Sequence, residues 1–243
     1  MNVVIVSYYY PPSAGPAGER IYFFAKKLSD KQINVVILSA NLGGDRHYPD
    51  LENVTHIQVG ELAIMAKKNR FIIIKKILSF FGFKFHILKS FGFLFDLTPH
   101  GKWKNEVLNK IKFGEINLPN KIDYVISSFP DRSSIDVGKV VASATGSKWI
   151  VDYRDLWSIN HYSGHSLLTK LFLVWKEKKI IKNSSALIFS SDGLMNDFKD
   201  HFDCVKQGYQ SAHDVIVSLS REFVNKQGAY IQFVCKEDSK VST

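Results

Sequence analysis

Short apolar runs rich in β-branched residues alternate with helical patterns along most of this chain, and this alternation limits its fold more than any other feature. Such runs are typical of strands buried on both faces of a sheet. They lie at residues 2–7, 34–40, 53–59, 123–128, 148–153 and 185–191, and the helical patterns lie at 18–30, 132–145, 166–183 and 191–200. Strands separated by helices indicate a parallel sheet. The pattern therefore predicts a doubly wound parallel α/β domain over residues 1–203.

The length and composition agree with such a domain. The 243 residues are enough for one large domain or two small ones, and 45% of them are hydrophobic. The two cysteines, Cys204 and Cys235, have no spacing typical of a metal site. We therefore expect two free thiols in a reducing compartment and no bound metal or other cofactor. Because the chain begins without a signal-peptide pattern, we expect a cytoplasmic protein.

A basic, aromatic insertion separates the third and fourth predicted strands, at about residues 60–121. Residues 64–113 hold eleven Lys and Arg residues and two acidic residues, a net charge of +9 that equals the charge of the whole chain. The lysines interrupt the apolar run too often for a membrane span. A nucleic-acid site is not expected, because the insertion is rich in Phe and Ile and has no recognition motif.

Two interpretations of this insertion remain open. It forms packed helices whose lysines face solvent, or it forms a surface that lies on an anionic membrane. In the second interpretation the protein is peripheral on the inner face of the membrane. The residues of that surface are Lys67, Lys68, Arg70, Lys75, Lys76, Lys84 and Lys89.

The loop after the first strand, residues 8–18, is rich in tyrosine, proline and glycine. In open α/β sheets, ligands bind at the carboxyl ends of the strands, where this loop lies. Gly15 and Gly18 allow the backbone to approach a ligand, and the N-terminus of the following helix favours an anion such as phosphate. Both glycines are also ordinary turn residues. The loop has no GxGxxG and the chain no GxxxxGK[ST], which argues against a dinucleotide site and a P-loop.

Four blocks of the sequence together resemble the N-terminal domain of family 4 retaining glycosyltransferases. They are VVIVSYYYPPSAGPAGERIYFFAKKLSDKQINVVILSA (3–40), FDLTPHGKWKNEVLNKI (95–111), KIDYVISSFPDRSSIDVGKVVASATGSKWIVDYRDLWS (121–158) and SALIFSSDGLMNDFKDHF (185–202). The third block contains an Asp-x-Arg-Asp-x-Trp motif at residues 152–157. The resemblance implies a Rossmann-like domain of the GT-B type. In the family this domain binds the acceptor.

The resemblance also implies roles for the first loop. In the family, the glycine loop faces the phosphates of the nucleotide-sugar donor, which implies the same for Gly15 and Gly18. The hydroxyl of Ser13 would add a hydrogen bond there.

The Asp-x-Arg-Asp-x-Trp motif follows a buried strand and offers groups suited to sugars and phosphates. Arg154 has a planar donor fork that matches phosphate or carboxylate. We expect Asp155 to be a catalytic residue, to accept a hydrogen bond from a sugar hydroxyl or to fix the arginine, and Trp157 to stack on a sugar face. The alternative is a structural ion pair that closes the loop, with the tryptophan packed beneath it. For Asp152, nearest the strand, a structural ion pair is the favoured interpretation.

The sequence departs from the family in its last part. A complete member has a second domain that binds the nucleotide sugar and carries two glutamates separated by seven residues, and no such pair occurs in this sequence. Residues 204–243 are interpreted as a tail and a remnant of that domain. We expect this tail either to pack on the first domain or to be poorly ordered. Two functions remain open. One is a glycosyltransferase that acts on a glycan or lipid-linked acceptor and needs a partner supplying the missing C-terminal domain; the other is a non-catalytic acceptor- or membrane-binding module.

Overall fold

The fold is taken from a computed structural model, which describes residues 1–13, 15–60, 99–158, 167–202 and 232–235. The lysine surface expected at residues 67–89 lies outside the described residues. Within them, no helix is long and apolar enough to cross a membrane.

Seven strands of the described chain form a single sheet in the order β3-β2-β1-β4-β5-β6-β7. All neighbours from β3 to β6 pair in parallel, and β7 pairs with β6 antiparallel at the edge. The strands are β1 (Asn2–Val6), β2 (Asn34–Ala40), β3 (Val54–Val59), β4 (Tyr124–Ser128), β5 (Lys148–Tyr153), β6 (Ala186–Phe189) and β7 (Gln232–Cys235). The doubly wound, Rossmann-like fold is confirmed. Strand β7 comes from the segment interpreted as a tail, so the sheet continues past residue 203.

Five helices of the described chain surround the sheet: α1 (Pro16–Ser29), α4 (Pro99–Lys112), α5 (Arg132–Thr145), α6 (Leu167–Asn183) and α7 (Asp192–His201). Their ends follow local capping rules. Helix α1 begins with a proline in its first turn, directly after Gly15. Asp131 caps α5, which ends at Gly146 in the left-handed conformation, and Ser191 caps α7. Helix α4 lies within the insertion.

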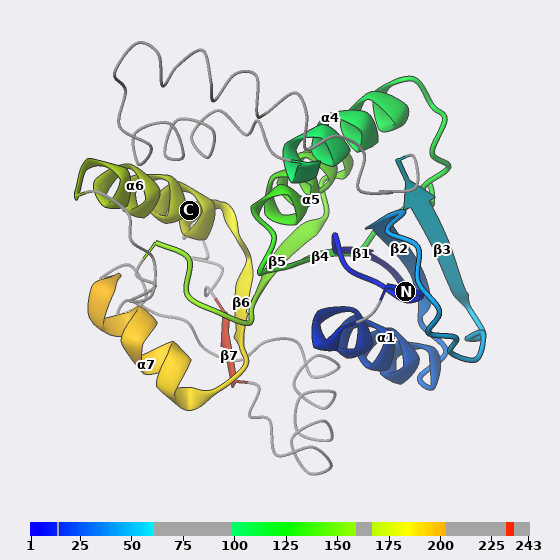
Figure 1. Ribbon diagram of the computed structural model, residues 1–243, viewed down its shortest axis with the longest axis horizontal. Coiled ribbons are helices and arrows are strands. Elements are labelled where there is room, and N and C mark those ends of the chain that lie inside the picture. Colours follow the sequence, from blue (N-terminus) through cyan, green and yellow to red (C-terminus); the bar gives the residue numbers. More distant parts are fainter. Residues whose placement is uncertain (14, 61–98, 159–166, 203–231, 236–243) are drawn as a thin grey trace, which may run out of the picture.

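The helices cover both faces of the sheet (Figure 1). On one face, Ile21 and Leu28 of α1 pack in a cluster with Val3 and Ile5 of β1. On the other face, side chains of α4, α5, α6 and α7 join a larger cluster, which includes Val4 of the same strand. The alternation of Val3, Val4 and Ile5 between the two clusters shows why the strand is apolar throughout, since neither of its faces meets water.

The direction of strand order reverses between β1 and β4. From β1 the chain continues through α1 to β2 on one side, whereas β4 lies on the other side and continues through α5 to β5. The loops that follow β1 and β4 therefore lead to helices on opposite faces (Figure 1). Open α/β sheets bind their ligands at this position, outside the carboxyl ends of the strands.

Candidate functional site

The loop after β1 is tied to the start of α5 by a short hydrogen-bond chain. The backbone N–H of Tyr8 donates to Oγ of Ser134 at 2.8 Å. The backbone N–H and the hydroxyl of Ser134 both donate to Oδ2 of Asp131, at 3.1 and 3.2 Å. These bonds cap α5 and fix the loop after β1 against the loop after β4. The reversal point of the sheet is therefore held in one conformation.

A histidine from a distant segment completes this cluster. His100, in the first turn of α4, has Nδ1 2.9 Å from Oδ1 of Asp131. The Asp131 side chain is 6% exposed and that of His100 is 33% exposed. Ser134 donates to Oδ2 of this carboxylate, so the imidazole lies against the other oxygen, Oδ1. The histidine ring also lies 4.1 Å from the Tyr8 ring and 6.3 Å from the Tyr9 ring, between centroids.

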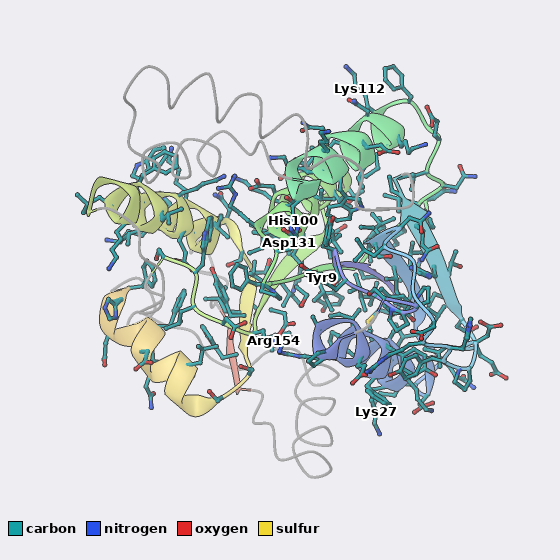
Figure 2. The ribbon with its side chains drawn as sticks, in the orientation of Figure 1. Tyr9, Lys27, His100, Lys112, Asp131 and Arg154 are labelled. Carbon is teal, nitrogen blue, oxygen red and sulfur yellow. The ribbon has the colours of Figure 1, made fainter. Side chains whose placement is uncertain are left out.

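The tyrosines of this cluster remain hydroxyl donors over a wide pH range. Burial and the negative charge of Asp131 raise the pKa of Tyr8 to about 12. The same two causes, burial first, raise the pKa of Tyr9 above its ordinary value. Figure 2 shows Tyr9, His100 and Asp131 gathered beside the ends of β1 and β4. A partly exposed imidazole beside two tyrosine rings can bind the hydroxyls of a sugar or the oxygens of a phosphate.

The two glycines of the first loop have different roles in the structure. Gly15 has φ of +133°, and a Cβ there would meet nothing within 4 Å, so its backbone faces open space. A Cβ on Gly18 would lie 3.3 Å from the backbone of Tyr10, so this glycine lets α1 pack closely against the loop. Ser13 is buried, and its hydroxyl donates to the carbonyl of Tyr10 at 2.7 Å. Of these three residues, Gly15 is the one whose position suits contact with a ligand.

The first aspartate of the Asp-x-Arg-Asp-x-Trp motif forms an ion pair within the domain. Asp152 is 3% exposed; its Oδ1 accepts from Arg20 of α1 at 2.5 Å and its Oδ2 from the hydroxyl of Ser128 at 2.9 Å. Burial raises the pKa of the Asp152 carboxyl, and Arg20, Ser128 and Arg154 oppose this rise. This arrangement fits the structural interpretation of Asp152. It links α1, β4 and β5 at their shared edge.

The next residues of the motif are more open. Arg154 is half-buried and Asp155 is exposed, and neither side chain forms an ion pair with another described residue. The hydroxyl of Ser190 donates to the carbonyl of Arg154 at 2.9 Å, which fixes the backbone there. Figure 2 places Arg154 near the first turn of α1. A guanidinium whose backbone is fixed and which lies beside a helix N-terminus is suited to bind an anionic ligand.

The tryptophan of the motif does not fit the stacking role expected from the sequence. Trp157 is 5% exposed and belongs to the larger core cluster, with its ring centroid 6.5 Å from that of Phe129. Its indole leaves no open face for a sugar ring. A tryptophan at this position can fix the loop by packing in the core or can stack on a sugar ring. The sequence alone does not distinguish these two roles.

A buried glutamate holds the end of the motif segment. Glu177 of α6 is 0% exposed, and its Oε2 accepts from the backbone N–H of Ser158 at 3.1 Å and from the Ser158 hydroxyl. Burial raises the pKa of Glu177 to about 7, against the lowering effect of the hydrogen bonds from Ser158 and Tyr153. Sequence reasoning missed both this residue and His100. Each lies on a helix of ordinary pattern and meets its partner only through the fold.

The described residues contain no group of three or more His, Cys, Asp or Glu side chains placed to hold a metal ion.

Comparison with known proteins gives likenesses among solved structures but none among sequence families. No protein-family model matches the chain, and no curated protein matches it. Among solved structures, the chain is similar to the sucrose-phosphate synthase from Thermosynechococcus elongatus, with 11% sequence identity and a TM-score of 0.47. The match covers 83% of this chain and 44% of that one, so the chain spans less than half the length of that protein. A likeness at this identity concerns the fold alone.

Proposed function

We propose that this chain supplies one side of a sugar-transfer site, in a glycosyltransferase that uses a nucleotide-sugar donor and a glycan or lipid-linked acceptor. The observation that carries the proposal is the set of polar groups at the reversal point of the sheet. Tyr9, the His100–Asp131 pair and Arg154 come from separate segments and lie at the ends of β1, β4 and β5 (Figure 2). The resemblance of four sequence blocks to family 4 retaining glycosyltransferases supports the same function.

The groups at this edge divide into two kinds. Arg154 and the open backbone at Gly15 suit the negative charge of a donor diphosphate. His100 and Tyr9 suit a sugar hydroxyl, since an imidazole nitrogen and a phenol can donate or accept hydrogen bonds. In the transfer, the bond from the sugar anomeric carbon to the diphosphate breaks and a bond to an acceptor oxygen forms. The hydroxyl proton leaves with the diphosphate, whose developing charge Arg154 stabilises.

A non-catalytic module that only binds its acceptor is the second candidate. This candidate needs only the acceptor-binding groups of the described edge, the His100–Asp131 pair and Tyr9. Sugar transfer by the purified chain, assayed with UDP-, GDP- and dTDP-sugars and a bacterial lipid extract as acceptor, separates the two candidates. Turnover by the chain alone would exclude the module. If transfer required an added partner protein, this chain would bind the acceptor and the partner would supply the rest of the transfer site.

The replacement Arg154→Ala tests the phosphate role. We expect the dissociation constant for a nucleoside diphosphate to rise about 10- to 100-fold, because a hydrogen bond between charged groups contributes about 1.5–3 kcal/mol. Isothermal titration with UDP, GDP and dTDP measures it. Lys148→Ala is the matched control, since Lys148 is exposed at the start of β5, whereas Arg154 follows the end of that strand. Equal affinity of the two variants would contradict the role of Arg154.

The replacement Asp155→Asn tests the catalytic role of the exposed aspartate. We expect sugar transfer to be abolished, while the free energy of unfolding changes by about 0.5 kcal/mol or less, because the side chain is exposed. Transfer assays and urea unfolding of the same preparation measure the two effects. A loss of stability in step with the loss of activity would show that Asp155 is structural instead.

A further inference from the structure

The outer face of helix α6 exposes large apolar side chains. Leu171 is 59% exposed, Trp175 is 52% exposed and Phe172 is 39% exposed. Elsewhere in the described chain, the exposed large apolar residues are single ones that lie far apart in the sequence: Met1, Phe113 and Val140. Scattered apolar residues on a surface are normal, whereas a contiguous group marks a contact site. The α6 face is therefore the strongest candidate for an interaction surface.

These residues belong to one face of the helix together with three lysines. Positions 171, 175, 178 and 182 recur at helical spacing, and positions 172 and 179 flank that line. The opposite side of the helix, with Leu173, Glu177 and Ile180, is buried against the domain. We call the outward set the α6 face; it consists of Leu171, Phe172, Trp175, Lys178, Lys179 and Lys182, all exposed.

The charge of the α6 face is entirely positive. Five lysines lie on α6, and its one acidic residue, Glu177, is buried on the inner side. Nζ of Lys179 lies 3.8 Å from the centre of the Trp175 ring, a cation–π contact that keeps charge and aromatic surface together. Lys176 points elsewhere, since its Nζ lies 3.6 Å from Asp136 of α5. The α6 face thus presents aromatic and leucine side chains beside lysines for which no acidic partner is found in the described part of the chain.

We propose that the α6 face docks the protein on an anionic lipid surface. A helix with lysines beside Trp, Phe and Leu is the type that lies in the plane of a membrane interface, with the lysines attracted to acidic headgroups. A second copy of this chain fits less well. In a two-fold contact the face would meet itself and bring its lysines against one another. This surface is distinct from the edge of the sheet that carries the proposed transfer site, and the two proposals are independent.

The tryptophans of this chain allow a direct optical test on the full-length protein. Trp103, Trp149 and Trp157 are 4%, 3% and 5% exposed, so Trp175 is the one open to solvent among the four in the sequence. On adding vesicles of equimolar phosphatidylglycerol and phosphatidylcholine at low salt, we expect a blue shift of tryptophan emission and loss of acrylamide quenching. Vesicles of phosphatidylcholine alone should give little change, and added salt should reverse the effect.

Two matched double variants locate the contact by vesicle co-sedimentation. Trp175→Ser with Lys179→Gln removes the aromatic–lysine pair of α6. Phe113→Ser with Lys112→Gln removes a similar pair at the end of α4, where Lys112 lies 5.8 Å over the Phe113 ring. In Figure 2 Lys112 lies on the opposite side of the view from α6. We expect the partition coefficient of the α6 variant to fall by about tenfold or more, since the loss of one lysine near an anionic surface alone lowers it about fivefold. The partition coefficient of the α4 variant should stay within about twofold of the wild-type value.

Three results would overturn the proposal. One is equal partitioning of the α6 variant and the wild type, with both variants folded by circular dichroism. Another is no binding to anionic vesicles at low salt. The third is self-association of the wild-type chain without lipid that the α6 variant abolishes, which would assign the face to a second copy. Loss of vesicle binding in the α6 variant alone, with sugar transfer or nucleotide binding unchanged in solution, supports the docking surface.

Discussion

Replacing Arg20 with methionine is expected to lower the free energy of unfolding by about 3–5 kcal/mol. The guanidinium is the cation paired with Asp152, whose side chain is 5% exposed at the end of β5. Methionine keeps most of the apolar stem but leaves the carboxylate buried without its charge partner. Urea unfolding followed by circular dichroism measures the loss. It should shrink at acid pH, where Asp152 takes up a proton and no buried charge remains.

Two controls separate this buried pair from an ordinary surface contact. Lys26 in the last turn of the same helix forms an ion pair with Asp30, which follows the helix, but both side chains are about half exposed. Lys26→Met should therefore cost only about 0–1 kcal/mol. In the double variant Arg20→Met with Asp152→Asn, the loss should be smaller than the sum of the single losses, because the uncompensated charge is gone. Strictly additive losses, or equal losses for Arg20 and Lys26, would show that the pair does not stabilise the domain.

The sequence predicts the framework of this fold closely because its elements are defined by local rules. The helix expected at 132–145 has those same bounds, since Asp131 caps its start and Gly146 adopts the left-handed conformation at its end. The strand expected at 148–153 also has those bounds. Both elements carry a regular apolar pattern between strong end signals. Strand period, helix period and capping all act over a few residues, so they can be read without the tertiary structure.

The contacts of the site could not be predicted in the same way, because they join segments far apart in the chain. Nothing near His100 in the sequence indicates Asp131 as its partner, and nothing near Arg20 indicates Asp152. The resemblance drew attention to these segments but indicated none of these pairs. Trp157 shows the related difficulty within a motif, since burial and sugar stacking both favour an aromatic residue. Strand β7 is a further example, because its pairing with β6 reverses the direction of an otherwise parallel sheet.

The second large effect is expected from the pH dependence of Glu177. Burial raises the pKa of its carboxyl from the ordinary 4.5 to about 7 in the folded chain. Between these two values the folded state holds a proton that the unfolded state has released. The free energy of unfolding contributed by this residue therefore falls as the pH rises through this window. The difference between the two pKa values corresponds to about 3 kcal/mol, lost when the pH is above 7.

The replacement Glu177→Gln isolates this effect from the other titrating groups. A glutamine oxygen still accepts from the Ser158 backbone and hydroxyl, but it has no charge to bury. As the pH rises from 4.5 to 8, we expect the free energy of unfolding of the variant to increase by about 3 kcal/mol relative to that of the wild type. Urea unfolding at a series of pH values measures this difference. Glu115→Gln is the control, because the Glu115 side chain is 56% exposed. For this variant and the wild type, the free energy of unfolding should change with pH in the same way. If the free energy of unfolding of Glu177→Gln also followed that of the wild type at every pH, the Glu177 carboxylate would stay ionised in the folded chain, held by Ser158 and Tyr153. In that case the loop after β5 would be fixed by a charged anchor at neutral pH, and the segment that carries Arg154 and Asp155 would not loosen as the pH rises.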